Sequence, residues 1–102
     1  MAKIDLNAVP EHDRRIKTYD FFKVLSNQRI RYYGKYKPAK TLGRTVGARL
    51  VIEVSIINGK PIRTWYESYD AQNRVIRIHP KTPKDLGHIE INPETKKEIE
   101  RW

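Results

Sequence analysis

The strongest constraint on the fold is a hairpin signal in the middle of the chain. Leu50–Ile57 is rich in β-branched residues, which are enriched in strands, and Asn58-Gly59 follows it at once. Asn-Gly between two apolar runs is among the strongest short-range signals for a β-hairpin. With Ile62–Tyr69 as the returning strand, the pattern predicts an antiparallel pair and places a sheet at the centre of the fold.

Further strands are predicted on both sides of this hairpin. Ile30–Tyr36 precedes it, and Val75–His79 follows a turn cluster. Pro80–Pro83 is expected to end that strand, because proline cannot donate to a sheet ladder. Gly87–Ile91 alternates once more, and residues 97–102 are either a strand or a short helix.

The front of the chain is predicted to be helical. Pro10 suits a first helical turn, and Glu11 and Asp13 favour its positive end. Thr18–Ser26 is predicted as a second short helix with Thr18 as its N-cap. A strand over Phe21–Leu25 is the alternative for the same residues.

These elements predict one α+β domain over residues 1–102. N-terminal helices (1–28) are expected to pack on a four-stranded antiparallel meander sheet (50–102), with a fifth strand as the alternative. A basic segment, residues 29–49, lies between the two parts.

Burial selects the register of the strands, because a slip of one residue turns every side chain to the other face. A three-residue loop at 58–60 gathers the alternate aliphatic side chains of Leu50–Ile57 on one face, which is predicted to pack on the N-terminal helices. A second three-residue loop, at 71–73, extends this apolar face with Ile76 and Ile78.

The opposite face of the sheet is predicted to be exposed and polar. In this register Trp65 lies opposite both Glu53 and His79, and Glu67 lies opposite Arg77. Cross-strand ion pairs of this kind are ordinary decoration of an exposed sheet, and a solvated histidine at a strand end is common, so a structural explanation stands beside any catalytic one.

The predicted polar face holds the groups that metal-independent RNA cleavage requires. The reaction needs a base for the 2′-hydroxyl, an acid for the leaving 5′-oxygen and a cation for the charged transition state. Histidine and glutamate are the usual proton carriers, and arginine is the usual electrostatic partner. The candidate catalytic residues are His79, Glu67, Glu53, Arg77, Arg63 and His88.

The segment Arg29–Arg49 holds seven Lys or Arg residues, three tyrosines and no acidic residue. Lys and Arg neutralise backbone phosphates, and aromatic faces stack on unpaired bases. The residues predicted to contact nucleic acid are Arg31, Tyr32, Tyr33, Lys35, Lys37, Lys40 and Arg44, with Trp65 as a further stacking platform. A solvated surface loop is the alternative.

The composition agrees with an anionic partner, since the net charge is +9 and the isoelectric point is about 9.9. No apolar run approaches the roughly 18 residues of a membrane span, and the first residues lack the apolar region of a secretion signal. The chain has no cysteine, which excludes disulfides and zinc–thiolate sites. Its three histidines show no metal-ligand spacing, so no metal or other cofactor is expected.

An ordered set of short motifs runs through residues 30–80. It consists of Arg31-Tyr32-Tyr33-Gly34, Lys37-Pro38-Ala39-Lys40-Thr41, Gly47-x-Arg49-Leu50-Val51, Gly59-Lys60-x-x-Arg63-Thr64-Trp65-x-Glu67, Asp70 and Val75-x-Arg77-x-x-Pro80. This order resembles the C-terminal toxin domains of bacterial Rhs-type and contact-dependent polymorphic toxins. The resemblance implies a compact α+β ribonuclease, neutralised by a cognate immunity protein.

The residues and the resemblance together predict a small metal-independent endoribonuclease, a bacterial toxin domain. Its expected partners are RNA, with tRNA as one candidate, and an acidic immunity protein, with no membrane partner. It is expected to be a monomer that acts in the cytoplasm of a target cell. The alternatives are a nucleic-acid-binding module without catalysis and an interaction protein whose basic patch docks an acidic partner.

Overall fold

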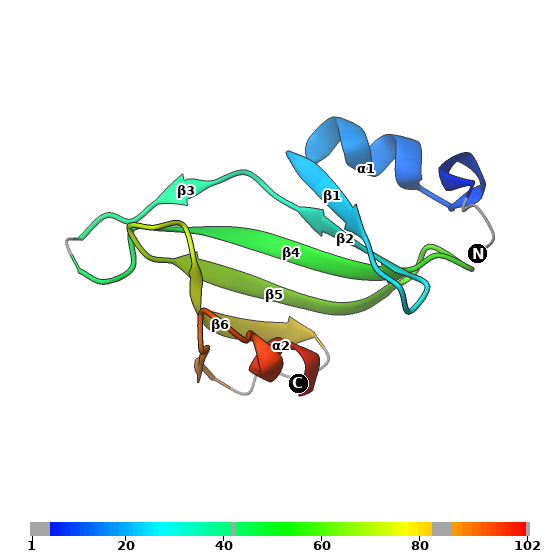
Figure 1. The fold of residues 1–102 in the computed structure, drawn as a ribbon. Helices are drawn as coiled ribbons and strands as arrows, with labels where there is room; N and C mark the ends of the chain where they lie inside the picture. Colours follow the sequence, from blue (N-terminus) through cyan, green and yellow to red (C-terminus); the bar gives the residue numbers. More distant parts are fainter. Residues whose placement is uncertain (1–4, 42, 83–86, 102) are drawn as a thin grey trace.

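The computed structural model describes residues 5–41, 43–82 and 87–101. Within them the chain forms a seven-stranded antiparallel sheet with one short N-terminal α-helix (Figure 1). The helical elements are η1 (Leu6–Ala8, a single 3-10 turn), α1 (His12–Thr18) and α2 (Lys97–Arg101). The strands are β1 (Phe21–Val24), β2 (Arg29–Tyr33), β3 (Lys37–Pro38), β4 (Gly47–Ser55), β5 (Pro61–Tyr69), β6 (Val75–Thr82) and β7 (Ile89–Glu90). The α+β class is confirmed, with the sheet dominant.

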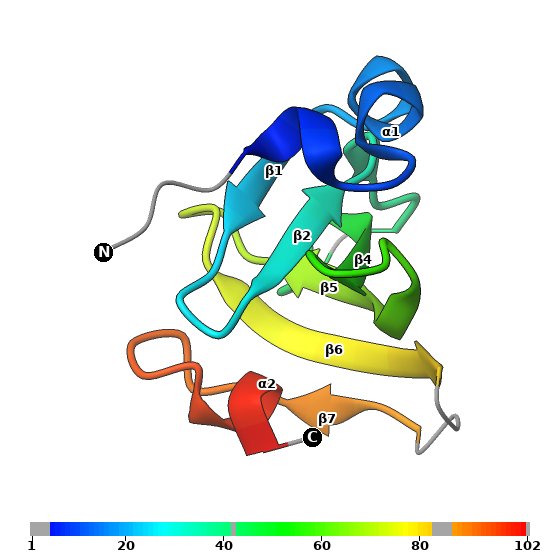
Figure 2. The ribbon, with the colours of Figure 1, turned by 90° about the vertical axis from the view of Figure 1, so that its right-hand side faces the viewer.

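The sheet has the order β1-β2-β4-β5-β6-β7, and β3 pairs with β4 beside β2. The long strands β4 and β5 form its centre. Figure 2 shows β1 and β2 at one end of the sheet and β6 and β7 at the other. The predicted strand at Ile30–Tyr36 is observed as β2, and the sheet has more strands than the predicted four or five because β1 and β3 also join it from the front half of the chain.

The predicted second helix at Thr18–Ser26 is wrong, and the alternative strand is confirmed. β1 pairs with β2 with Phe21 opposite Tyr33. Their rings stack with centroids 4.6 Å apart. This stacking and the ladder with β2 stabilise a strand over residues whose apolar spacing also suits a helix.

The register between β4 and β5 differs from the predicted one by two residues. Val51 lies opposite Trp65 and Glu53 opposite Arg63, with an irregularity after Glu53. A shift of two residues keeps every side chain on its predicted face. The turn depends on Gly59, whose φ is +68° and whose absent Cβ would collide with Pro10.

The register between β5 and β6 differs from the predicted one by one residue, and the side chains of β6 are on the opposite faces from those predicted. His79 lies opposite Tyr66, and Trp65 lies opposite Pro80. Tyr69 still pairs with Val75, as the three-residue loop at 71–73 predicts, and the cause is an irregularity between Ser68 and Tyr69 that shifts the following pairs by one residue. The prediction that Trp65 and His79 share a face is therefore wrong.

β6 does not end before Pro80 but continues through Lys81 to Thr82; Pro83 lies outside the described residues. The predicted strand at Gly87–Ile91 is confirmed over β7, which pairs with β6. At the end of the chain, α2 settles the choice between strand and helix in favour of a short helix.

Both faces of the sheet carry a hydrophobic core. On the α1 face, Val9 packs against Ile30, Tyr32 and Val54, so the predicted packing of the β4 aliphatics on the N-terminal region is confirmed there. On the other face, called the cavity face, the core is formed by side chains of four strands and the C-terminal region: Tyr33, Val51, Trp65, Tyr69, Val75, Ile78, Ile91 and Ile99. The face that was predicted to be exposed and polar is therefore largely buried.

Candidate active site

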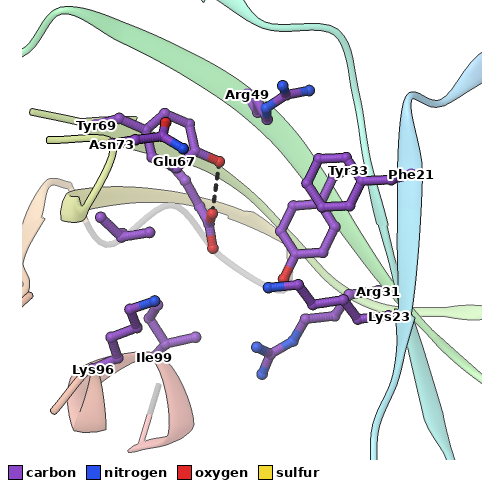
Figure 3. Close-up of a pocket in the computed structure, with 11 residues that line it drawn as sticks. Phe21, Lys23, Arg31, Tyr33, Arg49, Glu67, Tyr69, Asn73, Lys96 and Ile99 are labelled. Carbon is purple, nitrogen blue, oxygen red and sulfur yellow. Dashed lines mark hydrogen bonds between the residues drawn. The ribbon is translucent and has the colours of Figure 1, made fainter. Parts of the chain in front are cut away.

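A cavity of about 230 Å³ opens on the cavity face, and charged side chains surround it. β1, β2, β4 and β5 supply most of its wall, and residues near α2 close one side (Figure 3). The polar residues that line it and carry the argument are Lys23, Arg31, Tyr33, Arg49, Glu67 and Tyr69.

Strand alternation explains why these residues meet. Successive side chains of a strand point to opposite faces, so residues spaced by two share a face. Lys23 lies opposite Arg31 across the β1–β2 pair, and Arg49 lies opposite Glu67 across the β4–β5 pair. Four strands thus bring their charged side chains to one concave surface.

Glu67 is the carboxylate of this cavity, and its side chain extends into it (Figure 3). Only 3% of the residue is exposed. Its oxygens accept hydrogen bonds from Trp65 Nε1 at 3.1 Å and from the Tyr69 hydroxyl at 2.8 Å. Both donors are neutral, and within the described residues no Lys or Arg nitrogen lies within 4.0 Å of Glu67. The carboxylate is oriented without being neutralised.

Tyr69 and Tyr33 line the cavity, and their phenol groups are protonated. Burial raises the pKa of both phenols, and the negative charge of Glu67 raises them further. Tyr33 is held between Phe21, on which it stacks, and Lys23, whose Nζ lies 5.3 Å from its ring centroid. Its hydroxyl points towards the Lys23 and Arg31 side of the cavity (Figure 3).

Arg49 is fixed in place by backbone and side-chain acceptors. Its Nη1 donates to Asp20 Oδ2 at 2.8 Å and to the Gly34 carbonyl at 2.7 Å. The guanidinium carbon lies 5.0 Å from the ring centroid of Phe21 and 5.7 Å from that of Tyr36. A cation between two aromatic rings is well placed to bind a phosphate whose base stacks on one of them.

Glu53 has a different environment from Glu67. Its carboxylate is fully buried and accepts hydrogen bonds from Arg29 at 2.9 Å, Arg31 at 2.8 Å and Arg63 at 3.0 Å. Burial acts to raise the pKa of Glu53, but hydrogen bonds from these arginines, Arg63 foremost, lower it to about 2. So weak a base favours a structural role over the predicted catalytic one.

Trp65 does not offer a stacking platform to RNA, and that part of the prediction is wrong. Its side chain is fully buried. The guanidinium carbons of Arg63 and Arg31 lie 5.1 and 5.3 Å from its ring centroid. Arg63 also donates to the Ile99 carbonyl at 2.6 Å, so it anchors α2. The predicted catalytic Arg63 is thus engaged within the fold.

The predicted histidine and arginine of β6 lie on the α1 face, away from Glu67. His79 is opposite Tyr66, and its ring centroid is 4.7 Å from that of His88. Arg77 donates to Glu90 Oε1 at 2.7 Å instead of pairing with Glu67. The predicted cluster therefore separates into two groups on opposite faces.

The predicted nucleic-acid residues of the basic segment also separate. Arg31 and Tyr33 line the cavity. Tyr32 is fully buried on the α1 face, where its hydroxyl lies 2.7 Å from His12 Nδ1, so its predicted stacking on RNA is wrong. The remaining four are exposed on the arm between β2 and β4: Lys35, Lys37, Lys40 and Arg44.

Sequence reasoning missed Lys23, Tyr69, Lys96 and the stacking ring of Phe21, and did not select Arg49 from its basic segment. One signal was present: a strand over Phe21–Val24 puts Phe21 and Lys23 on one face. Lys96, whose φ is +55°, lies just before α2 and enters the cavity wall through tertiary structure alone.

Comparison of the chain with protein-family models, with curated proteins and with solved structures gave no match. No group of three or more potential metal ligands occurs in the described ranges. None of the helices there is long and apolar enough to cross a membrane.

Proposed function

We propose that the protein is a metal-independent endoribonuclease whose active site is the cavity lined by Glu67. The observation that carries the proposal is a buried carboxylate, oriented by two neutral donors, facing a wall that contains Lys23, Arg31 and Arg49. A base surrounded by phosphate-binding cations is the arrangement that transesterification of RNA requires.

In the proposed reaction Glu67 is the general base. It accepts the proton of a ribose 2′-hydroxyl, and the 2′-oxygen attacks the adjacent phosphorus. The hydrogen bonds from Trp65 and Tyr69 hold the carboxylate in one orientation for this step. These donors are uncharged, whereas Glu53 is paired with three arginines.

The cations of the cavity stabilise the transition state. Negative charge builds up on the non-bridging oxygens as the 2′-oxygen attacks, and fixed guanidinium groups lower the energy of that charge. Arg49 is immobilised by Asp20 and Gly34, and Arg31 by Glu53. Neither side chain has to be ordered during the reaction.

Tyr33 is assigned as the proton donor to the leaving group. Its raised pKa keeps the phenol protonated, and its hydroxyl faces the cavity near Lys23 and Arg31 (Figure 3). As the bond from phosphorus to the 5′-oxygen breaks, Tyr33 supplies a proton to that oxygen. The products are a 2′,3′-cyclic phosphate and a 5′-hydroxyl, and solvent returns the proton from Glu67 to Tyr33.

The rim of the cavity favours unpaired RNA. Phe21 is 41% exposed and Tyr36 is 38% exposed, and both rings lie beside Arg49. Aromatic faces of this kind stack on bases that are not paired, without strong preference among them. The resemblance to polymorphic toxin domains adds a context: a toxin that cuts RNA, tRNA among its candidate targets, in a target cell and is inhibited by an acidic immunity protein.

The test is cleavage of total RNA in the presence of EDTA. We expect fragments with 2′,3′-cyclic phosphate ends, no cleavage of the matching DNA, and a loss of about 100-fold or more in Glu67→Gln. Glu94→Gln, the same change at an exposed residue, is the control and should cleave as wild type.

Undiminished cleavage by Glu67→Gln would refute the assignment of the base. A gel shift without cleavage would favour the alternative of a binding module, which the exposed cations of the arm also support: Lys35, Lys37, Lys40 and Arg44.

A further inference from the structure

A second cavity, of about 400 Å³, lies at the turn between β1 and β2. The turn supplies Ser26 and Asn27, and the strands supply Arg29, Arg31 and Arg63. Arg31 lines this cavity and also the active-site cavity. The two cavities therefore adjoin across one guanidinium group.

The second cavity carries a fixed positive charge. Three guanidinium groups pair with the carboxylate of Glu53, and the charges of Arg29 and Arg31 alone outnumber that of Glu53. Glu53 is fully buried, and its low pKa keeps it ionised. Glu53 holds the three guanidinium groups together, and because it is buried it cannot contact a ligand.

Arg29 and Arg31 keep donors for a ligand, whereas Arg63 donates to Glu53 and to the Ile99 carbonyl. Arg29 uses Nη1 for Glu53, and Arg31 uses Nε. Each planar guanidinium has five N–H groups, and the remaining ones suit bidentate binding of a phosphate. The exposed fraction of the side chain is 36% for Arg29, 17% for Arg31 and 10% for Arg63, so Arg29 is the most accessible of the three.

We propose that this arginine cavity binds a second phosphate of the RNA backbone, next to the phosphate that is cut in the Glu67 cavity. The identity of the ligand rests on the proposed ribonuclease function. A polyanion with one phosphate per nucleotide can occupy both cavities through Arg31, whereas a single acidic side chain can occupy only one. The hydroxyl of Ser26 and the amide of Asn27 add neutral donors suited to phosphate oxygens.

The first experiment follows inorganic phosphate by NMR. On titration we expect shifts of the backbone amide signals of residues 26–29 and of the Arg29 and Arg31 side-chain signals. In Arg29→Gln these shifts should need at least tenfold more phosphate. Arg14→Gln is the matched control, because Arg14 lies on α1, over the other face, and pairs only with the neighbouring Glu11 among the described residues.

The second experiment measures binding of a 2′-O-methyl RNA oligonucleotide as a function of salt. This probe lacks the 2′-hydroxyl nucleophile, so it is bound and not cut. For single strands each neutralised phosphate contributes about 0.7 to the slope of log K against log salt. Arg29→Gln should lower the magnitude of the slope by about that amount, Arg29→Lys should retain it because the charge is kept, and Arg14→Gln should leave it unchanged.

An unchanged slope in Arg29→Gln, or phosphate shifts that are the same in this variant and in wild type, would overturn the proposal. So would equal competition by polyglutamate against the oligonucleotide, because the cavity would then fit an acidic protein. These readouts do not depend on cleavage. If Glu67→Gln cut RNA normally while Arg29→Gln lost the salt-dependent contact, the proposed catalytic mechanism would fail and the phosphate site would stand.

Discussion

Arg49 lies directly opposite Glu67 across the β4–β5 pair, yet its guanidinium group donates to Asp20 and to the Gly34 carbonyl instead of to the Glu67 carboxylate. Asp20, just before β1, thus keeps a cation beside the proposed base without joining the two in an ion pair. The arrangement leaves one group free to accept a proton and the other free to bind phosphate.

The first prediction concerns this role of Asp20. In Asp20→Asn the attraction that holds Arg49 aside is weakened, and Arg49 can turn to Glu67. We expect kcat to fall about tenfold, equal to about 1.4 kcal/mol, while urea unfolding changes little, because the Arg49–Asp20 pair is partly exposed. Asp13→Asn, at an exposed position on α1, is the control. Wild-type kcat in Asp20→Asn would show that the pair has no positioning role.

The second prediction concerns Tyr33 as the proton donor. Tyr33→Phe keeps the ring that stacks on Phe21 and removes only the hydroxyl. With an RNA substrate we expect a loss of about 100-fold in kcat, since general acids contribute about 10²–10⁴-fold. With a nucleoside 3′-nitrophenyl phosphate as the substrate, the nitrophenolate leaving group needs no proton. The loss of kcat in Tyr33→Phe should then nearly disappear. Equal losses with both substrates would contradict the assignment; Tyr66→Phe, on the α1 face, should behave as wild type.

The third prediction concerns the acid stability of the fold. The folded-state pKa of Glu53 is lowered to about 2 from an ordinary value of 4.5. A lowered pKa stabilises the folded state above the unfolded value, and that stabilisation is lost as the pH falls from 4.5 towards 2. We expect the free energy of unfolding to fall across this window in wild type.

Removing the Glu53 charge provides the check. Glu53→Gln leaves three arginines without their buried counter-ion, and breaking such a pair costs about 3–5 kcal/mol. In urea titrations the variant should be less stable at neutral pH and should lose less stability than wild type between pH 4.5 and 2. A Glu94→Gln variant should follow the wild-type curve, and an identical pH dependence in Glu53→Gln would contradict the prediction.

The fourth prediction concerns His79, which the sequence suggested as a catalytic residue and which the structure places away from the cavity. His79 and His88 lie on the α1 face, opposite the proposed base. We expect His79→Ala and His88→Ala to cut RNA within about twofold of wild type, since neither group touches the cavity. A loss of about 100-fold in His79→Ala, measured in EDTA, would instead support histidine acid–base catalysis on that face.

The sequence alone predicts the strands of this fold better than their pairing. The β-branched run and Asn58-Gly59 locate β4 and β5, and an error of two residues in their register left Glu67 on the correct face. An irregularity between Ser68 and Tyr69, which the sequence did not reveal, shifted the register by one residue and placed His79 on the face opposite to the predicted one. Bulges decide such shifts, because they place an extra residue in one strand of a pair.

Some of the residues predicted for the site line the cavity together, and others do not. Glu67 was selected from the strand register, and Arg31 and Tyr33 from the basic segment, and all three line the cavity. Lys23 was missed because its segment has apolar spacing that suits a helix, and only pairing with β2 makes it a strand. Burial of Trp65 and Glu53 was missed because α2 covers that face, and contacts over such sequence separations leave no local pattern.

The cavity wall runs from Lys23 on the first strand to Lys96 and Ile99 near the far end of the described chain. Contacts of such long range form late, since the intervening residues must be ordered first. A nascent chain on the ribosome would thus hold its basic residues near RNA long before it held a base aligned with them. The proposed ribonuclease activity would therefore appear only when the sheet is complete.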